Sequence, residues 1–143
     1  MRVVFDDGTV LDEDYLLAVA ANGLCYGGFH PAPLAKIDDG IIDFCGFTRV
    51  SRFFISRLVG QYKAGKHLEH PALKAHVNYK RCTSFTVESD VPFTICMDGE
   101  ISSGYRLDVR ILPRALQILL PASCVPQGKT AAHQVKGPAA AYI

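Results

Sequence analysis

The stretch from Asn22 to Asp43 constrains the fold more than any other part of this chain. Residues 22–33 hold three glycines, which allow unusual backbone shapes, and two prolines, which lack N–H donors. Neither a helical nor a strand period fits it, so roughly twenty residues form an irregular loop, a length that is usually functional or disordered. Apolar side chains such as Tyr26, Phe29 and Ile37 favour packing over disorder. We therefore expect a packed, functional loop between two apolar runs.

Short β-like runs on either side of this loop predict strands. Asp6-Asp7-Gly8 and Asp98-Gly99 have the composition of hairpin turns, and we expect the first to lie between runs 2–5 and 15–21. The run 105–111 alternates apolar and charged residues, as a half-buried strand does. The other predicted strands are residues 41–47, 77–88 (as one long strand or a bent pair), 93–97 and 116–120.

One convincing helix is predicted, over about residues 51–64. Ser51 has the position of an N-cap, and Gly65 that of the glycine that ends a helix. Between them, apolar residues recur at helical spacing on one face: Phe54, Ile55, Leu58, Val59 and Tyr62. Many short strands with one helix predict a mainly β fold, a two-layer β-sandwich with one amphipathic helix.

The chain is 143 residues long, which is one domain by the usual prior. We expect a folded domain over residues 1–120 and a mobile tail or linker over residues 121–143, where Pro, Gly and Ala accumulate without periodicity. A net charge of +1 gives no reason to expect nucleic acid as a partner. No apolar run approaches the roughly 20 residues that span a bilayer, and the N-terminus does not have the composition of a secretion signal.

The five cysteines favour a reducing compartment. Their number is odd and no pair has C-x-x-C spacing, so the pattern is typical of buried thiols in a cytoplasmic protein. They are Cys25, Cys45, Cys82, Cys96 and Cys124. His67-Leu-Glu-His70 does not have the H-E-x-x-H spacing of a zinc pair, so a zinc site is not favoured.

Motifs in a fixed order give the chain a family resemblance. They are Asn22-Gly23, Tyr26-Gly27-Gly28, Ala32-Pro33, Ala35-Lys36, Asp38-Asp39-Gly40-Ile41-Ile42-Asp43, Gly65-Lys66-His67 and Asp98-Gly99-Glu100. Over residues 1–120 the chain resembles the C-terminal domain of the bacterial diacylglycerol kinase and sphingosine kinase-like lipid kinases. The family pattern has three glycines after the tyrosine, whereas here Phe29 follows the second one.

The resemblance implies a magnesium ion at the Asp38-Asp39-Gly40 turn. Asp39 would supply a carboxylate, and Lys36 and Ile41 their carbonyl oxygens, a set of hard oxygen ligands that suits Mg²⁺. Without the resemblance, Asp38-Asp39-Gly40 is an ordinary turn sequence.

The resemblance also assigns a catalytic role to Glu100, as the general base that takes the proton of a lipid hydroxyl. Asn22 would lie near the cleft between domains and contribute to nucleotide binding. Read from the residues alone, Glu100 is equally an ordinary hairpin residue and Asn22 a turn cap.

We therefore hypothesise that the chain is the C-terminal domain of a cytoplasmic lipid kinase. The complete kinase would transfer the ATP γ-phosphoryl group to a diacylglycerol-like lipid and contact the membrane peripherally. A glycine-rich phosphate loop is missing from the sequence. The family carries its Gly-Gly-Asp-Gly-Thr loop on an N-terminal domain, so that domain is an expected partner and the isolated chain should be inactive. A non-catalytic lipid-binding or interaction module and a relative of the NAD kinases remain alternatives. The oligomeric state is open, a homodimer included.

Overall fold

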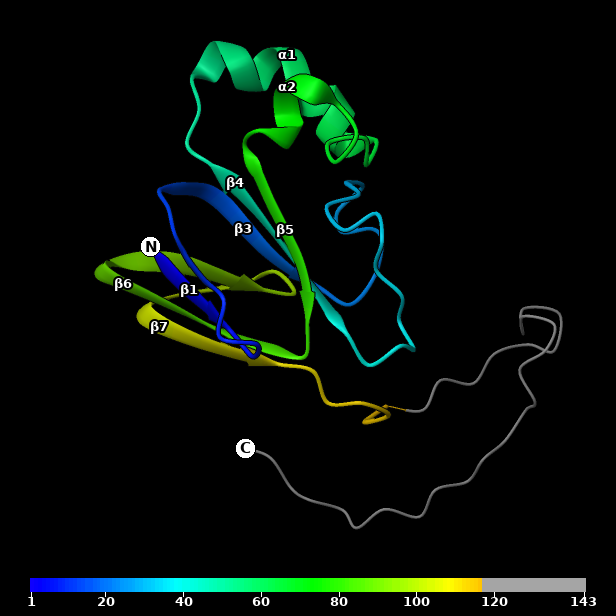
Figure 1. Ribbon diagram of the computed structural model, residues 1–143, viewed down its shortest axis with the longest axis vertical. Coiled ribbons are helices and arrows are strands. Elements are labelled where there is room, and N and C mark those ends of the chain that lie inside the picture. Colours follow the sequence, from blue (N-terminus) through cyan, green and yellow to red (C-terminus); the bar gives the residue numbers. More distant parts are fainter. Residues whose placement is uncertain (117–143) are drawn as a thin grey trace, which may run out of the picture.

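The computed structural model describes residues 1–116 (Figure 1). In chain order the elements are β1 (Arg2–Phe5), β2 (Val10–Asp12), β3 (Tyr15–Ala21), β4 (Ile42–Thr48), α1 (Arg52–Lys63), α2 (Pro71–Lys74), β5 (Val77–Cys82), β6 (Ser84–Met97) and β7 (Glu100–Arg110). The predicted tail over residues 121–143, with Cys124, lies outside the described residues, as does all of the predicted strand 116–120 after Leu116. None of the helices within residues 1–116 is long and apolar enough to cross a bilayer.

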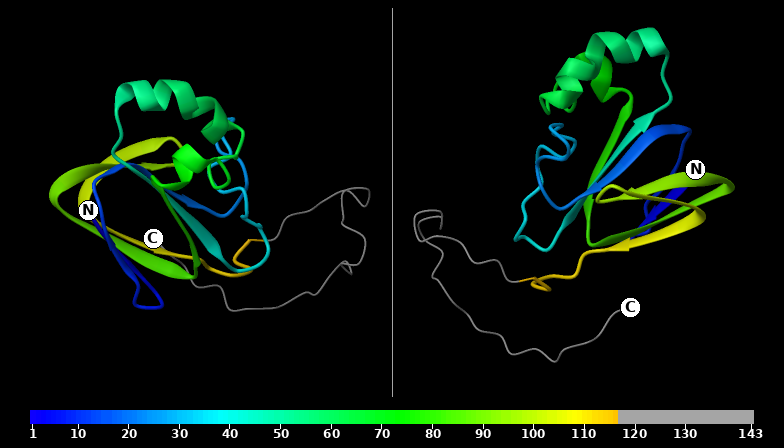
Figure 2. Two further views of the ribbon diagram at one scale, coloured as in Figure 1. Left: turned by 45° about the horizontal axis from the view of Figure 1, so that its top comes forward. Right: turned by 180° about the vertical axis from the view of Figure 1, so that it is seen from behind.

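The strands form two antiparallel sheets, which confirms the predicted β-sandwich. Sheet A has the order β2-β1-β6-β7 and sheet B the order β3-β4-β5. Figures 1 and 2 show the two sheets packed against each other, with both helices on the far side of sheet B. Between the sheets lies an apolar core of Val3, Phe5, Ile42, Phe44, Cys82, Phe85 and Val87.

Strand β4 is buried on both faces because it lies in the middle of this arrangement. Its even-numbered residues, such as Phe44, face the core between the sheets. Cys45 and Phe47 face the opposite way and pack with Leu73 of α2. Successive side chains of a strand point to opposite faces, so this burial requires a layer beyond sheet B. Helices α1 and α2 and the loop 22–41 form that layer.

Helix α1 begins and ends as predicted. The hydroxyl of Ser51 accepts a hydrogen bond from the Phe54 N–H at 3.3 Å, and Gly65 has a φ of +73° after the C-cap Ala64. Phe54, Leu58 and Tyr62 pack on the Cys45 and Phe47 face of sheet B, but no residue of the helix is fully buried. The apolar face of α1 therefore covers the sheet and stays partly open to solvent.

Two short elements differ from the sequence prediction. The Asp6-Asp7-Gly8 turn does not lead into β3, because β1 pairs with β2 instead and β3 belongs to the other sheet. Strand β2 has three residues, too few for a visible alternation. Helix α2 has four residues and begins with Pro71, which suits the first turn of a helix.

Strands β6 and β7 form one long hairpin. Residues 84–97 make a single strand where the sequence predicted two, and the pairing shifts register between Glu88 and Phe93. Pro92 lies in this interval, and a bulge accommodates a residue that has no N–H to donate. Leu107, Val109 and Ile111 pack on the core, as the predicted alternation requires, whereas Tyr105 is exposed.

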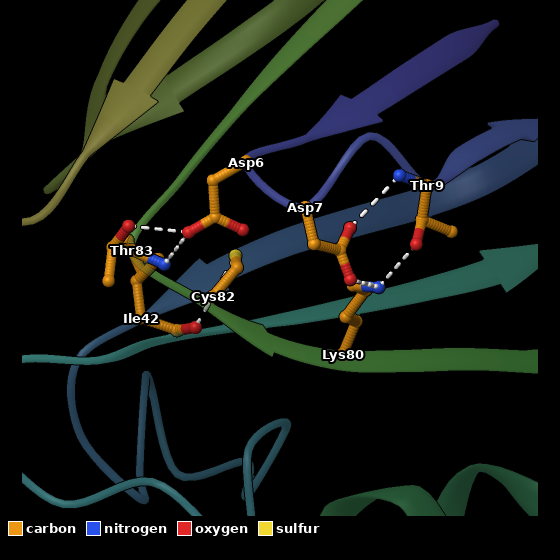
Figure 3. A network of polar contacts seen from close by, with 7 residues as sticks. All are labelled: Asp6, Asp7, Thr9, Ile42, Lys80, Cys82 and Thr83. Atoms are coloured by element: carbon orange, nitrogen blue, oxygen red, sulfur yellow. Dashed lines mark hydrogen bonds and ion pairs between the residues drawn. The ribbon is translucent and has the colours of Figure 1, made fainter.

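A polar network at the β1–β2 turn joins the two sheets (Figure 3). The Asp6 carboxylate accepts from the Thr83 N–H at 2.7 Å and from the Thr83 hydroxyl. Asp7 accepts from the Lys80 ammonium at 2.6 Å, which holds the pKa of the Asp7 carboxyl well below its usual range. Lys80 also donates to the Thr9 hydroxyl at 2.7 Å. The turn of sheet A thereby fixes the end of β5 in sheet B, next to Arg81.

Candidate functional site

The paired glycines of the long loop make a tight two-residue turn. Tyr26 and Phe29 exchange backbone hydrogen bonds at 2.8 and 2.9 Å, and Gly27 and Gly28 have φ angles of +55° and +79°. Positive φ at both central residues is the type I′ geometry, which glycine adopts without steric cost. The loop with two glycines is therefore a closed, ordered hairpin tip.

The segment after this tip is held against the end of α1. The His30 Nδ1 lies 2.9 Å from the Lys63 carbonyl, and the Phe29 ring packs on Tyr62 with centroids 5.8 Å apart. A side chain at Gly65 would approach the His30 Cβ to 3.1 Å, so the loop and the helix end are in close contact. The loop is packed through Phe29, Ala32 and Ala35, whereas Tyr26 and Ile37, which we expected to pack, are 52% and 69% exposed.

Asp39 closes the turn that ends the loop. Its Oδ1 accepts from the Ile41 N–H at 3.0 Å, and its Oδ2 forms an ion pair with the Arg81 guanidinium. Gly40, which lies between Asp39 and Ile41, has a φ of +72°. The structure thus places Asp39 and Ile41 in one turn, as predicted, and adds an arginine to it.

Asp43 lies directly beyond this turn and is completely buried, with 0% of its side chain exposed. Its Oδ1 accepts from the Tyr79 hydroxyl at 2.6 Å and lies 3.3 Å from the Arg81 Nε. Burial raises the pKa of Tyr79, and the bond to Asp43 raises it further, so the hydroxyl remains a donor. The Leu34 N–H reaches the same hydroxyl at 3.4 Å, which connects the loop to sheet B.

Glu100 begins β7, immediately after the Asp98-Gly99 turn. Asp98 and Gly99 have φ angles of +49° and +98°, which confirms the predicted hairpin. The carboxylate is exposed, and within residues 1–116 it has no hydrogen bond or ion pair. A carboxylate that is free to accept a proton is what a general base requires.

The hairpin tip that bears Glu100 lies beside the glycine loop. The Tyr26 hydroxyl is 3.7 Å from the Cys96 Sγ, and this contact, with a smaller effect from Asp98, raises the pKa of Tyr26. At the opposite end of β7, a side chain at Gly40 would meet Pro113 at 3.7 Å. The loop therefore extends along the hairpin, with Glu100 and Asp39 near different ends of β7.

The remaining predicted residues lie on the loop surface. Asn22 follows β3 and is exposed, as is Lys36, which precedes the Asp39 turn. A carboxylate with backbone carbonyls is a donor set that suits Mg²⁺. The residues of the turn therefore fit the predicted metal in type, while Arg81 already holds one carboxylate oxygen.

An apolar groove runs between α1 and β3. Its volume is about 200 Å³, and its lining is formed by Leu16, Leu17, Phe29, Phe47, Val50, Phe54, Ile55, Leu58, Val59, Tyr62 and Leu73. All of these side chains are apolar except for the hydroxyl of Tyr62. The groove can therefore take a hydrocarbon chain and offers little to a polar ligand.

His67 is buried beside Cys45, with its Nε2 3.7 Å from the thiol sulfur. Burial lowers the pKa of His67 and raises the pKa of Cys45 to about 12, so both groups are neutral. Across residues 1–116, His, Cys, Asp and Glu side chains nowhere gather in threes that could hold a metal ion. Cys45 and Cys82 are buried free thiols, as predicted, whereas the prediction of buried thiols is wrong for Cys25 and Cys96, which are free but exposed.

No functional role was predicted from the sequence for Asp43, Tyr79 or Arg81. Asp43 gives a weak signal, because it is a charged residue in the apolar run of β4. Arg81 lies opposite it only through the register of β4 and β5.

Comparison with known proteins identifies related chains. A family model described as "YegS C-terminal NAD kinase beta sandwich-like domain" matches residues 1–120. A probable lipid kinase YegS-like from Shewanella frigidimarina is 29% identical over 124 residues, which cover 85% of this chain and 38% of the relative. The fold is similar to that of a putative diacylglycerol kinase from Bacillus anthracis, with a TM-score of 0.60 and 21% identity, covering 78% of this chain and 37% of the other. The chain thus spans well under half of each of these two proteins.

Proposed function

Because this chain belongs to the family of YegS C-terminal NAD kinase beta sandwich-like domains, we propose that it is the lipid-side half of an ATP-dependent lipid kinase. The complete enzyme transfers the γ-phosphoryl group of ATP to the hydroxyl of a diacylglycerol-like lipid. The Shewanella relative is described as a probable lipid kinase, which supports the reaction class. The chain covers 38% of that relative, so we assign nucleotide binding mainly to a domain beyond this one.

The observation that carries the proposal is the free carboxylate of Glu100 beside the glycine loop. A lipid hydroxyl is a poor nucleophile until a base removes its proton, and a carboxylate within about 3 Å can do so. In the proposal, Glu100 accepts this proton as the hydroxyl oxygen attacks the γ-phosphorus. The terminal phosphoryl then leaves the β-phosphate oxygen, and ADP departs.

Magnesium, when bound with ATP, would neutralise the charge that develops on the phosphate oxygens. We propose that Asp39 and the carbonyls of Lys36 and Ile41 hold a magnesium ion at their turn, and that Asn22 faces the nucleotide. Asp39 is already ordered by the Ile41 N–H, so its carboxylate is positioned before any ion arrives. The Asp39 turn lies near the other end of β7 from Glu100, so the ion at this turn would order the loop and would be distinct from the one bound with ATP.

The apolar groove between α1 and β3 favours a substrate with a hydrocarbon chain over a dinucleotide. Phe53, at the start of α1, is 85% exposed, which supports peripheral contact with a membrane that supplies the lipid. We expect the chain to sediment with phosphatidylcholine vesicles, and Phe53→Ser to weaken this binding. Arg57→Ser, on the same helix and also exposed, is the control.

To test the proposal, the N-terminal half of the Shewanella relative is fused to this chain, and the fusion is called the joined protein. We expect the joined protein to phosphorylate diacylglycerol from radiolabelled ATP at about 1 per second or faster, and the isolated chain to give no product. Phosphorylation of NAD instead of lipid would favour the NAD kinase alternative. Lipid binding by the isolated chain without turnover by the joined protein would favour a non-catalytic module.

A further inference from the structure

Arg81 joins two carboxylates that come from different parts of the chain. Its Nη2 pairs with the Asp39 Oδ2 in the loop turn, and its Nε lies 3.3 Å from the Asp43 Oδ1 on β4. Arg81 and Asp43 are direct partners in the β4–β5 register. One guanidinium therefore fastens the turn to the sheet, in the place where the proposed magnesium ion would act.

The charges at this point do not balance. Asp39 and Asp43 carry two negative charges and Arg81 one positive charge, which leaves one negative charge among the three groups. Asp43 is 0% exposed and its Oδ2 has no hydrogen-bond partner within residues 1–116. A buried carboxylate is stable only when its charge is compensated and its oxygens are bonded. The unpartnered oxygen is a second indication, besides the acidic turn, that this position favours more positive charge than Arg81 supplies.

The three groups also differ in exposure. The side chain of Asp39 is 22% exposed and that of Arg81 36%, whereas Asp43 is enclosed. Arg81 can thus swing away from Asp39 into solvent, while Asp43 cannot move without opening the sheet. The partly exposed contact between Arg81 and Asp39 contributes little and is easily released. The contact with the buried Asp43 is costly to lose, so a cation that displaces Arg81 must also compensate the charge of Asp43.

From this geometry we propose that Arg81 occupies the cation position of the Asp39 turn, and that a divalent cation binds there only by displacing the guanidinium. The proposal rests on the magnesium turn of the proposed function. With Arg81 in place, Asp39, Asp43 and Arg81 have a net charge of minus one. With a divalent ion in place of Arg81, the two carboxylates and the ion have a net charge of zero. Arg81 then sets the metal affinity of the turn and keeps the loop attached to β5 when metal is scarce.

The test uses Mn²⁺ as a probe, because carboxylate, carbonyl and water ligands that suit Mg²⁺ also suit Mn²⁺. Binding to the whole chain is measured by electron paramagnetic resonance without nucleotide or lipid. We expect Arg81→Gln to bind Mn²⁺ at least about tenfold more tightly than the unaltered chain, because a competing cation is removed. Arg81→Lys keeps a positive charge but not the two-pronged contact, so its affinity should lie in between.

Two further variants make the result specific. Arg106→Gln removes an arginine that pairs with Glu88 and Asp108 on sheet A, so it changes the net charge equally and should leave Mn²⁺ binding unchanged. Asp39→Asn combined with Arg81→Gln should abolish the gain. Circular dichroism melting curves check that each variant is folded, and Arg81→Lys serves if Arg81→Gln does not fold.

The outcomes separate the two proposals. Equal and tight binding by the unaltered chain and Arg81→Gln would refute the exchange and leave the magnesium turn standing. Absence of binding by all of the variants would refute both the exchange and the metal turn. Neither result bears on phosphoryl transfer, which the activity of the joined protein decides.

Discussion

Gly46 in the middle of β4 should tolerate no side chain. A Cβ at this position would lie 2.5 Å from the Tyr15 Cε1 and 3.0 Å from two atoms of the Phe44 ring. Carbon atoms pack at about 3.5–4.0 Å, so Gly46→Ala forces the Tyr15 ring to move by about 1 Å. That ring also packs edge-on against Phe44, and its hydroxyl accepts from the Asn78 side chain at 3.0 Å.

The magnitude follows from these two losses. Overpacking a filled core costs about 1–3 kcal/mol, and a displaced hydrogen bond about 0.5–1.5 kcal/mol. We therefore expect Gly46→Ala to lower the free energy of unfolding by about 2–4 kcal/mol. At roughly 3–5 °C per kcal/mol for a domain of this size, the melting temperature should fall by about 6–20 °C.

Urea unfolding followed by far-ultraviolet circular dichroism measures this, and it does not depend on tryptophan, which the chain lacks. Gly60→Ala is the matched control, because Gly60 lies in α1 and a methyl group added there would meet no atom within 4 Å apart from its chain neighbours and the backbone of its own helix. It should stabilise the helix by about 0.5–1 kcal/mol. Tyr15→Leu should recover part of the loss in the Gly46→Ala background if the clash is with that ring. A Gly46→Ala variant within about 0.5 kcal/mol of the unaltered chain would refute this account of the packing around β4.

Three further predictions concern α1 and His67. Leu58→Ala should cost about 1–2.5 kcal/mol, below the roughly 2–5 kcal/mol of a fully buried leucine, because Leu58 is half-buried; Val59→Ala, at a residue that is 44% exposed, should cost less in the same urea titration. Ser51→Ala should cost about 1 kcal/mol through loss of the N-cap, and Ser51→Asp should restore it. Burial lowers the pKa of His67 below its usual 6.5, so the unfolded chain binds a proton that the folded chain does not; stability should fall as the pH drops from about 7 to 5, and less steeply in His67→Gln. Identical slopes for the two proteins would contradict this role of His67.

Local signals predicted the elements that depend on neighbouring residues. Ser51 and Gly65 mark the ends of α1 correctly, because capping is decided within one helical turn. The Asp98-Gly99 hairpin and the glycine loop were also found, since positive φ at these positions requires particular residues. Strand β2 and helix α2 were not predicted, because three or four residues are too few to show a strand or helix periodicity in their apolar residues.

The partners of β1 and Asp43 could not be read from the sequence, because they depend on register. Asp6-Asp7-Gly8 indicates a turn but not which strand follows it into the same sheet. Arg81 meets Asp43 only once β4 and β5 are aligned residue by residue. The family resemblance supplied Asp39 and Glu100, while the ion pair that changes the environment of Asp39 came from the structure.

The most direct test of the central claim is the effect of Glu100→Gln on kcat in the protein that joins this chain to the N-terminal half of the Shewanella relative. Glutamine keeps the size of the side chain but cannot take a proton, so kcat should fall by about 10²–10⁴-fold while ATP binding and the melting temperature stay unchanged. Glu69→Gln, at an exposed residue after α1, is the matched control and should leave kcat unaltered. A Glu100→Gln enzyme with the kcat of the parent would contradict the proposal that this carboxylate is the base.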